Sequence, residues 1–359
     1  MAAATQQINM DTQKLEEFAG KVMTDIAGAM AVLLGYVGDQ TGVYRALRDH
    51  GPSTAAELAG AASVDERYLL EWLSAQAAAG YVDYHPQSET FSLSAEQAIV
   101  LAEEGHPACM HGFIQQLTAQ FTTHEKAVET FRSGEGRGWE DHHSCCFCGT
   151  DRFFRAGYNA NLIDHWLPAL DGVDDLLKAG GRVADIGCGL GSSTLLMAQA
   201  YPESHFDGFD FHAESIKEAN ERAASAGLSE RMRFQTRSAK ETPAKGYDLV
   251  CMFDCLHDMG DPVGAARRIR ECLAEDGTLM LVEPMAGDTL SDNLNTVGQI
   301  FYSASTLICT PASKAQEVGL ALGAQAGEKR LTEVLRQAGF TRIRRATETP
   351  TNIVLEARP

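Results

Sequence analysis

The sequence predicts an α/β protein in which a mainly helical domain precedes a seven-stranded, mostly parallel sheet with helices on both faces. Two observations predict it. Up to about residue 172, apolar residues recur at helical spacing, with a single two-stranded segment around Pro86. From Gly181 onward, short β-branched runs alternate with helical stretches, which is typical of a Rossmann-like sheet. We expect its strands at residues 182–186, 205–210, 232–235, 247–253, 278–283, 341–346 and 352–356.

This pattern divides the chain into three regions. We expect a helical domain at residues 1–105, a helical bridge at 106–172 that covers an active site, and the sheet domain at 173–359. Residues 284–330, between the fifth and sixth strands, are long for a connection. Ordered insertions of that length commonly form lids or substrate loops.

The first region has the pattern of a winged helix. Thr54 and Glu57 predict a capping box that opens one helix, residues 65–79 predict a second helix, and residues 81–93 predict a two-stranded wing. Residues 15–47 predict one or two further helices, and residues 22–47 offer more apolar surface than one winged helix can cover. We therefore expect these helices to form a homodimer.

The charge balance argues against DNA as the partner of this winged helix. The chain has 30 basic and 49 acidic residues, which gives a net charge of −19. The second helix begins Asp65-Glu66-Arg67 and continues with Glu71, where a DNA-reading helix would carry Lys and Arg. A negatively charged surface repels the phosphates of nucleic acids. We therefore expect the winged helix to contact protein and to bind no nucleic acid. A transcription regulator is the alternative.

We expect no targeting or membrane-spanning segment. The N-terminus has no basic stretch followed by an apolar run, so it does not resemble a signal peptide. The most apolar early stretch, residues 26–37, has about twelve residues, whereas a span needs ~20. Nine scattered cysteines favour thiols over disulfides. A cytoplasmic protein that binds no membrane is expected.

The strongest functional signal is a glycine-rich turn between a strand and a helix. The turn contains Asp185, Gly187, Gly189, Gly191 and Thr194. Glycines permit the tight turn and let a ligand approach the backbone. Dinucleotide-binding enzymes hold a pyrophosphate at this helix N-terminus and rarely place a carboxylate beside it. A carboxylate suits a ligand with an amino group and a sulfonium, so the pattern predicts S-adenosylmethionine.

Two more strand ends carry polar residues. Asp210 lies 25 residues after Asp185, about where the acidic ribose ligand of a βαβ unit lies, and Phe211 can lie against adenine. Ligands of open α/β sheets bind at the carboxyl ends of the strands. We therefore expect Phe253 and Asp254, at the end of the fourth strand, to border the cofactor.

Together these motifs resemble the class I S-adenosylmethionine-dependent methyltransferases over residues 155–359. With the winged helix and the triplet Leu256-His257-Asp258, the whole chain is similar to small-molecule methyltransferases that include plant phenolic O-methyltransferases and related bacterial enzymes. The resemblance implies that His257 is a general base and that Glu283 helps to orient it. Asp258 or Glu283 would fix the tautomer of the histidine.

The chain departs from that family at two positions. The family often has an Asp near the end of the third strand for the adenine amine. This chain has Thr236-Arg237-Ser238-Ala239 there, so Ser238 or the backbone must bind adenine. Met259 stands where the plant motif has Trp, so the phenolic substrate class does not carry over.

Three residues outside these motifs are candidates for ligand contact. Tyr158 can cover the methionine end of the cofactor, and Arg155 can hold an acceptor carboxylate. Plain helix packing is the alternative for both. Tyr302, within residues 299–307, is expected in the acceptor wall.

One segment combines two histidines with three cysteines: His142, His143, Cys145, Cys146 and Cys148. Thiolate and imidazole are preferred zinc ligands, but the spacing is not that of a regular zinc site. We expect no metal in the protein, and we expect His142 and His143 to contact the substrate. A soft acceptor at this cluster (a thiol, thioether or metalloid) is the alternative.

The sequence thus predicts methyl transfer from S-adenosylmethionine to an O, N or S atom of a small molecule. In-line displacement depends mainly on positioning. A hydroxyl or protonated amine also needs a base, for which His257 is the candidate. A thioether or other soft acceptor needs no base. An inert cofactor-binding scaffold is a further alternative.

Overall fold

The computed structural model describes residues 10–359 and divides into two compact units, one ending at Thr118 and one spanning Ala119–Pro359. The division falls inside α6 (His111–Thr122). Ile114 packs in the core of the first unit, whereas Ala119 packs in an apolar cluster of the second. One helix therefore contributes to both cores, and the compact first unit extends beyond residue 105.

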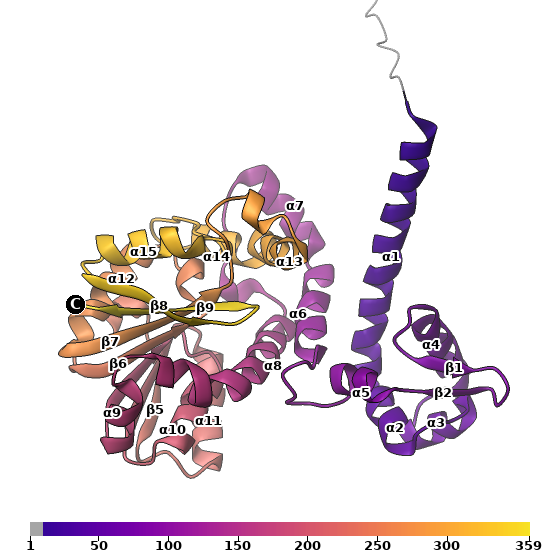
Figure 1. Cartoon of the computed structure of the whole chain (residues 1–359), viewed down its shortest axis with the longest axis horizontal. Helices are drawn as coiled ribbons and strands as arrows, with labels where there is room; N and C mark the ends of the chain where they lie inside the picture. Colours follow the sequence, from indigo (N-terminus) through magenta and orange to yellow (C-terminus); the bar gives the residue numbers. More distant parts are fainter. Residues whose placement is uncertain (1–9) are drawn as a thin grey trace, which may run out of the picture. The chain divides into compact units, whose positions relative to one another are not determined.

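The first unit is helical apart from one hairpin. Its elements are α1 (Thr12–Thr41), α2 (Val43–His50), α3 (Ala55–Ala62), α4 (Glu66–Ala78), β1 (Asp83–His85), β2 (Thr90–Ser92) and α5 (Ala95–Leu101) (Figure 1). Thr54 and Glu57 form the predicted capping box at the start of α3. The antiparallel pair β1–β2, with Tyr84 opposite Phe91, is the predicted wing. The winged helix is confirmed.

The core of this unit forms around Tyr44 and Trp72, whose ring centroids lie 4.9 Å apart. Trp72 Nε1 donates to Leu34 O at 2.8 Å. Tyr44 Oη donates to Gln76 Oε1 at 2.8 Å, so both buried polar tips have partners. A Cβ on Gly38 would lie 2.3 Å from the Trp72 ring. The C-terminal part of α1 therefore packs closely against α4.

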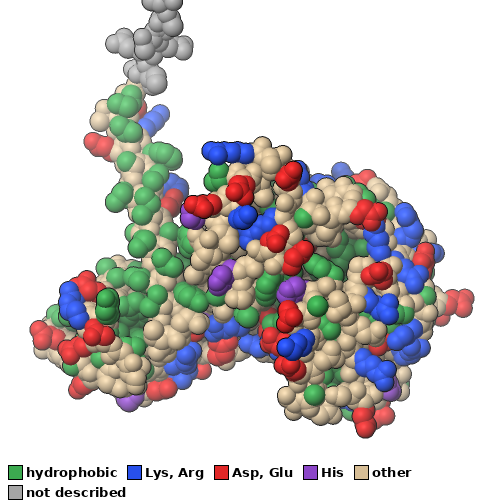
Figure 2. Space-filling view, turned by 180° about the vertical axis from the view of Figure 1, so that it is seen from behind, with side chains coloured by type: hydrophobic (Ala, Val, Ile, Leu, Met, Phe, Trp, Pro, Cys, Tyr) green, Lys and Arg blue, Asp and Glu red, His purple; other side chains and the backbone are tan. Residues whose placement is uncertain are grey.

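The N-terminal part of α1 presents an apolar stripe. Leu15, Phe18, Val22, Ile26 and Met30 recur at helical spacing, and each is at least 41% exposed. Figure 2 shows hydrophobic side chains along this helix. Val22, Ile26 and Met30 belong to the surface predicted for residues 22–47, and among residues 10–118 they stay exposed.

Within residues 10–359, α1 is the one helix long and apolar enough to cross a membrane, judged by length and composition only. The expectation from residues 26–37 was wrong about length, because α1 continues for 30 residues without a break. Only 11% of its most apolar window is buried. An exposed apolar face of this kind needs another surface to cover it. The length of the helix does not show whether that surface is lipid or protein.

The second unit contains the sheet. Its helices are α7 (His124–Ser133), α8 (Ser144–Asn161), α9 (Val173–Ala179), α10 (Ser192–Ala200), α11 (Ala213–Ser225), α12 (Pro262–Cys272), α13 (Thr296–Ala304), α14 (Thr310–Lys314) and α15 (Gly327–Gln337). Its strands are β3 (Arg182–Ile186), β4 (His205–Asp210), β5 (Met232–Thr236), β6 (Tyr247–Phe253), β7 (Leu273–Pro284), β8 (Arg342–Glu348) and β9 (Asn352–Arg358). These are the seven predicted strands, with β7 longer at its start.

The strand order is β5-β4-β3-β6-β7-β9-β8, and in this sheet of the described chain β9 runs opposite to the other six strands. Alternate residues of β3 face opposite cores. Val183 joins the cluster that includes α9, α10 and α11, whereas Ala184 and Ile186 join the cluster that includes α12 and α15. Helices cover both faces of the sheet (Figure 1). Polar side chains therefore gather at the carboxyl ends of the strands.

Residues 284–330 form ordered structure rather than a plain loop. Besides α13 and α14, they include the 3-10 turn η6 (Ser291–Asn293) and the π-helical turn η7 (Ser305–Cys309). Ile308 and Cys309 pack in one cluster with Cys146 of α8. The insertion therefore rests on the helical bridge, and a role as a substrate loop stays a prediction.

Candidate active site

Three glycines with positive φ shape the loop after β3: +70° at Gly187, +51° at Gly189 and +78° at Gly191. A Cβ would lie 2.8 Å from Cys255 at Gly187 and 2.6 Å from the Phe234 ring at Gly191. These two positions therefore need glycine for space as well as for conformation. A Cβ at Gly189 would meet nothing within 4 Å. The backbone at Gly189 borders open space that a ligand can enter.

Asp185, near the end of β3, is fully buried. Its Oδ2 accepts hydrogen bonds from Ser193 Oγ and Thr194 Oγ1, both at 2.7 Å. Its Oδ1 is buried and has no hydrogen-bond partner in the described part of the chain. Burial raises the pKa of Asp185 to about 6, although the two hydroxyl groups oppose the rise. Thr194, predicted as a cofactor contact, thus holds Asp185, and Oδ1 remains available for a ligand.

Asp210, the last residue of β4, is held beside the glycine loop. Its Oδ2 accepts the Gly189 N–H at 2.9 Å, and its Oδ1 accepts the His212 N–H at 2.8 Å. Burial raises the pKa of Asp210, and these backbone donors oppose the rise. Each carboxylate oxygen keeps acceptor capacity beyond one bond. Phe211, the next residue, is 50% exposed, so its ring is accessible to a ligand.

The end of β6 contributes Phe253 and Asp254. Asp254 has a left-handed backbone (φ +48°), and its Oδ1 accepts from Asn352 Nδ2 at 2.8 Å. Its Oδ2 is buried without a hydrogen-bond partner among residues 10–359, and burial raises its pKa well above the usual value. Tyr158 of α8 lies against Phe253, with ring centroids 5.1 Å apart. Helix α8 therefore packs against this strand end, and contact of Tyr158 with a cofactor stays a prediction.

Ser238 and Ala239 follow β5 and enter the 3-10 turn η4 (Ala239–Glu241). The Ser238 N–H and hydroxyl both donate to Glu241 Oε2, at 3.1 and 2.9 Å. The Ser238 side chain is thus engaged in its own capping box. Adenine binding by these two residues stays a prediction.

His257 lies in the 3-10 turn η5 (Leu256–Asp258) and is buried between two carboxylates. Its Nδ1 is 2.5 Å from Glu283 Oε2, and its Nε2 is 3.2 Å from Asp258 Oδ1. Glu283 Oε1 accepts the Leu256 N–H at 2.9 Å. Burial alone would lower the pKa of His257, but Glu283 and Asp258 raise it well above its usual value. The predicted trio is therefore assembled, and its two carboxylates favour the protonated form of the ring.

Cys309, at the end of η7, was missed by sequence reasoning. Donor atoms of His257, Asp258 and Cys309 lie within 4.8 Å of one another, a set that could hold a metal ion. Burial raises the pKa of the Cys309 thiol to about 12. The available signal was its position two residues beyond the predicted acceptor wall at 299–307. Tyr302 lies half-buried on α13, and its contact with an acceptor stays a prediction.

The histidine–cysteine segment forms the entry to α8. His143 Nδ1 accepts the Cys145 N–H at 3.2 Å and so caps the helix. His142 is buried, and burial lowers its pKa to about 4, so it is neutral at pH 7. Cys146 packs in an apolar cluster of the second unit. Within residues 10–359, neither of the two metal-competent groups includes Cys148 or these residues. Substrate contact by the two histidines stays a prediction.

A polar network that the sequence did not reveal fixes α8 to the start of α10. Asp151 accepts from Ser192 Oγ at 2.5 Å and from Arg222 Nη1 at 3.1 Å. Arg155 Nη1 lies 3.7 Å from the same carboxylate. Arg155, predicted to bind an acceptor carboxylate, therefore has an internal partner one helical turn away. No spacing rule connects Asp151 with Arg222, which lies 71 residues later.

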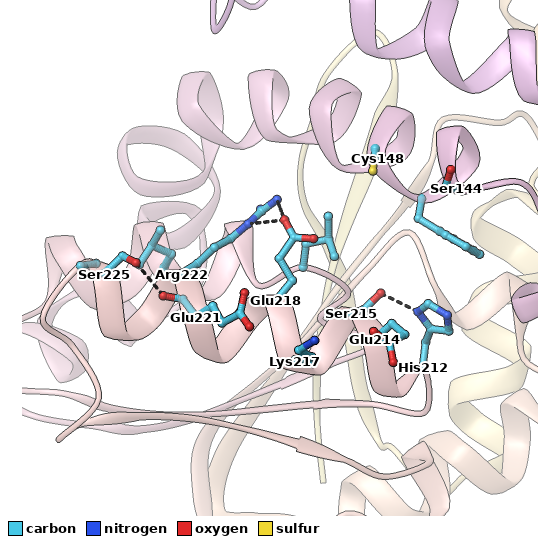
Figure 3. A pocket seen from close by; sticks show the side chains of 14 residues that line it. Ser144, Cys148, His212, Glu214, Ser215, Lys217, Glu218, Glu221, Arg222 and Ser225 are labelled. Atoms are coloured by element: carbon cyan, nitrogen blue, oxygen red, sulfur yellow. Dashed lines mark hydrogen bonds and ion pairs between the residues drawn. The ribbon is translucent and has the colours of Figure 1, made fainter.

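A pocket of about 830 Å³ lies between α8 and α11, whose side chains face each other across it (Figure 3). Phe147 and Cys148 line it from α8, and Arg222, paired with Glu218, lines it from α11. Leu190 of the glycine loop also lines it. The pocket thus opens beside the loop that borders the open space at Gly189.

Two family matches cover separate parts of the chain. Residues 177–339 match a family described as "Methyltransferase domain". Residues 28–103 match one described as "Rv2258c-like winged HTH domain". The first match contains the glycine loop, Asp210, His257 and Glu283, and the second contains the winged helix of the first unit.

Among curated proteins, the chain is 33% identical over 107 residues to 27-O-demethylrifamycin SV methyltransferase of Amycolatopsis mediterranei. The match covers 29% of this chain and 39% of that protein. The chain matches less than half the length of the first curated relatives. The likeness therefore concerns part of each relative rather than its whole length.

Solved structures match the whole chain. Human N-acetylserotonin methyltransferase in complex with S-adenosylmethionine has a TM-score of 0.71 and 16% identity, covering 100% of this chain and 99% of that one. Mitomycin 7-O-methyltransferase MmcR has a TM-score of 0.65 and 20% identity, covering 97% and 100%. At these identities the likeness shows the fold.

Replacing Glu283 with Gln should lower the pKa of His257, because the carboxylate that opposes burial is removed. The midpoint measured by NMR titration of the labelled imidazole should fall by about 1 to 3 pH units. Glu241→Gln, an equally conservative change at the exposed capping box of η4, should leave it in place. An unchanged midpoint in folded Glu283→Gln would show that Glu283 does not hold the imidazolium.

Proposed function

Because residues 177–339 are a methyltransferase domain, we propose that the protein transfers a methyl group from S-adenosylmethionine to a small molecule. The observation that carries the proposal is the set of carboxylates at neighbouring strand ends. Asp185 and Asp254 each keep one buried oxygen without a hydrogen-bond partner in the described chain. Buried acceptors of that kind call for a polar or cationic ligand.

The residues around the glycine loop fit this cofactor. Asp210, fixed by two backbone donors, can accept from both ribose hydroxyls, and Phe211 offers an exposed ring for adenine. Gly189 lets the ligand approach the backbone. Asp185 supplies negative charge for a cationic group. When bound, S-adenosylmethionine supplies an activated methyl group on a sulfonium.

The chain's part in the reaction is to align the acceptor and, for a hydroxyl or protonated amine, to remove its proton. In this role His257 Nε2 accepts the proton that the acceptor loses, while Glu283 holds Nδ1. Asp258 faces Nε2 at 3.2 Å, so the acceptor must displace it to reach the ring. Only the neutral ring can act as a base. Because the pKa of His257 is raised, the neutral ring forms at a pH above the usual range for histidine.

A second candidate is a thioether or other soft acceptor, which loses no proton. The observation that favours it is the ion pairing of His257 on both ring nitrogens. In that case the imidazolium is structural. The names of relatives such as mitomycin 7-O-methyltransferase support an oxygen acceptor for this chain.

Two alternative functions involve no methyl transfer. A transcription regulator would use α4 on DNA, but its exposed Arg67 is paired with Glu71 and Glu66 stands beside it. An inert scaffold would bind the cofactor without methylating any acceptor. A DNA-shift assay and a methyl-transfer assay with a library of hydroxyl, amine and thioether compounds separate these from the enzyme.

We further propose that the protein is a cytoplasmic homodimer. None of the nine cysteines forms a disulfide, which suits a reducing compartment. The apolar stripe of α1 offers a surface for a second copy of the chain.

Asp210→Ala should weaken S-adenosylmethionine binding by about 1.5–3 kcal/mol, because two hydrogen bonds to a charged acceptor are lost. Calorimetry measures the affinity. Asp207→Ala, on the same strand but paired with Lys245 and Tyr247, is the matched control and should bind normally. Normal affinity in folded Asp210→Ala would remove Asp210 from the site.

His257→Gln should reduce turnover by about 10²–10⁴-fold with little change in cofactor affinity. Because the pKa of His257 is raised, wild-type activity should climb with pH through a limb above pH 6.5, the usual midpoint for histidine. The variant should lack that limb. Near-normal turnover in the variant would reject the base and favour the soft acceptor.

Light scattering should show a dimer that Phe18→Glu combined with Ile26→Glu converts to a monomer, because two charges enter the apolar stripe. Gln13→Glu combined with Thr24→Glu adds the same charge to the polar face of α1 and should leave the dimer intact. A monomeric wild-type protein at high concentration would contradict the proposal.

A further inference from the structure

We propose that the winged-helix unit contains a zinc site formed by Glu104, Cys109 and His111, in the turn that joins α5 to α6. A ring nitrogen of His111, Cys109 Sγ and a Glu104 carboxylate oxygen lie within 4.8 Å of one another. This set combines thiolate, imidazole and carboxylate, the three donors that Zn²⁺ takes in proteins. All three residues belong to the first unit, whereas the methyltransferase site belongs to the second.

The state of His111 points independently to a ligand. The residue is 1% exposed, and both of its ring nitrogens are buried without a hydrogen-bond partner among residues 10–359. A buried imidazole nitrogen without a partner is rare, because its desolvation is not compensated. A metal ion bound at Nε2 provides that compensation.

Asp39 completes the arrangement from α1. His111 Nδ1 lies 3.1 Å from Asp39 Oδ1. Metal-binding histidines usually direct their second nitrogen to a carboxylate, which fixes the ring and its tautomer. Arg45 Nη2 donates to the backbone oxygen of Asp39 at 3.1 Å, and Nη1 lies 3.3 Å from Oδ1, so the carboxylate is itself held in place. With Nδ1 at ion-pair distance from Asp39, we assign Nε2 to the metal.

The three donors need only a small contraction. In a tetrahedral zinc site, neighbouring ligand atoms are roughly 3.3–3.8 Å apart, as follows from zinc–ligand distances of about 2.0–2.3 Å. Glu104 is exposed, while Cys109 and His111 are buried. Three protein ligands leave the fourth position to water. Bound zinc would tie the α5–α6 turn to the end of α1.

The sequence did not suggest this site. Its spacing, Glu104-x₄-Cys109-x-His111, matches no regular zinc pattern, and the expectation of no metal was based on the cluster at 142–148. Asp39 lies 72 residues before His111, and only folding brings the two together.

The test is zinc binding by the full chain after reduction and removal of metal with a chelator. Titration against a chromophoric chelator should give one Zn²⁺ per chain. Cys109→Ser and Glu104→Gln should each weaken binding at least about tenfold, and Asp39→Asn by about 10–100-fold. Co²⁺ should give thiolate absorption bands that Cys109→Ser abolishes.

Two substitutions serve as matched controls and should bind Zn²⁺ as wild type does. Cys148→Ser removes an exposed thiol outside the site. His106→Asn changes a histidine of the same turn, whose Nδ1 accepts the Ala108 N–H, a bond that Asn can replace.

Three results would overturn the proposal: no Zn²⁺ bound by the wild-type chain, unchanged affinity in Cys109→Ser and Glu104→Gln, or loss of Zn²⁺ in Cys309→Ser. The last would assign the ion to the group around His257 instead. Circular dichroism checks the folding of each variant. If Cys109→Ser unfolds, the exposed Glu104→Gln decides.

Discussion

The burial of carboxylates at the ends of neighbouring strands is the constraint around which the second unit is built. Asp185, Asp210, Asp254 and Glu283 lie at the ends of β3, β4, β6 and β7. A buried carboxylate without donors is strongly unfavourable. The fold supplies hydroxyls to Asp185, backbone amides to Asp210, an amide side chain to Asp254, and a backbone amide and an imidazole to Glu283.

These donors compensate the buried negative charge only in part, which suits a cationic ligand. Burial raises the pKa of Asp185, Asp210 and Asp254, which means that negative charge accumulates there at a cost. A bound positive group would lower that cost, and binding and ionisation would then support each other. Glu283 already contacts the His257 ring inside the protein, and the pKa of that ring is raised by Glu283 and Asp258. The charges of these carboxylates and of His257 thus affect both the binding of the cofactor and the reaction of the acceptor.

The helices that cover this edge are irregular where they reach it. Helix α8 brings Tyr158 to Phe253 and continues into the π-helical turn η2 (Leu162–Trp166). The insertion brings Cys309 to His257 at the end of another π-helical turn, η7. Such turns are frequent at functional sites, because the wider backbone redirects side chains without ending the helix. Helix α8 is held by the Asp151 network and by the contact of Tyr158 with Phe253, and the insertion is held by its packing against Cys146.

The sequence by itself determined the elements and the local motifs. The seven strands, the winged helix, the capping box at Thr54 and the glycine loop with Asp185 all follow from periodicity and short spacing, which depend on neighbouring residues. Only the tertiary structure decided which groups face one another. It placed Arg222 against Asp151, and it brought Cys309 and Asp39 to their histidines. Those contacts depend on how distant segments pack, and no local pattern in the chain specifies the distance between them.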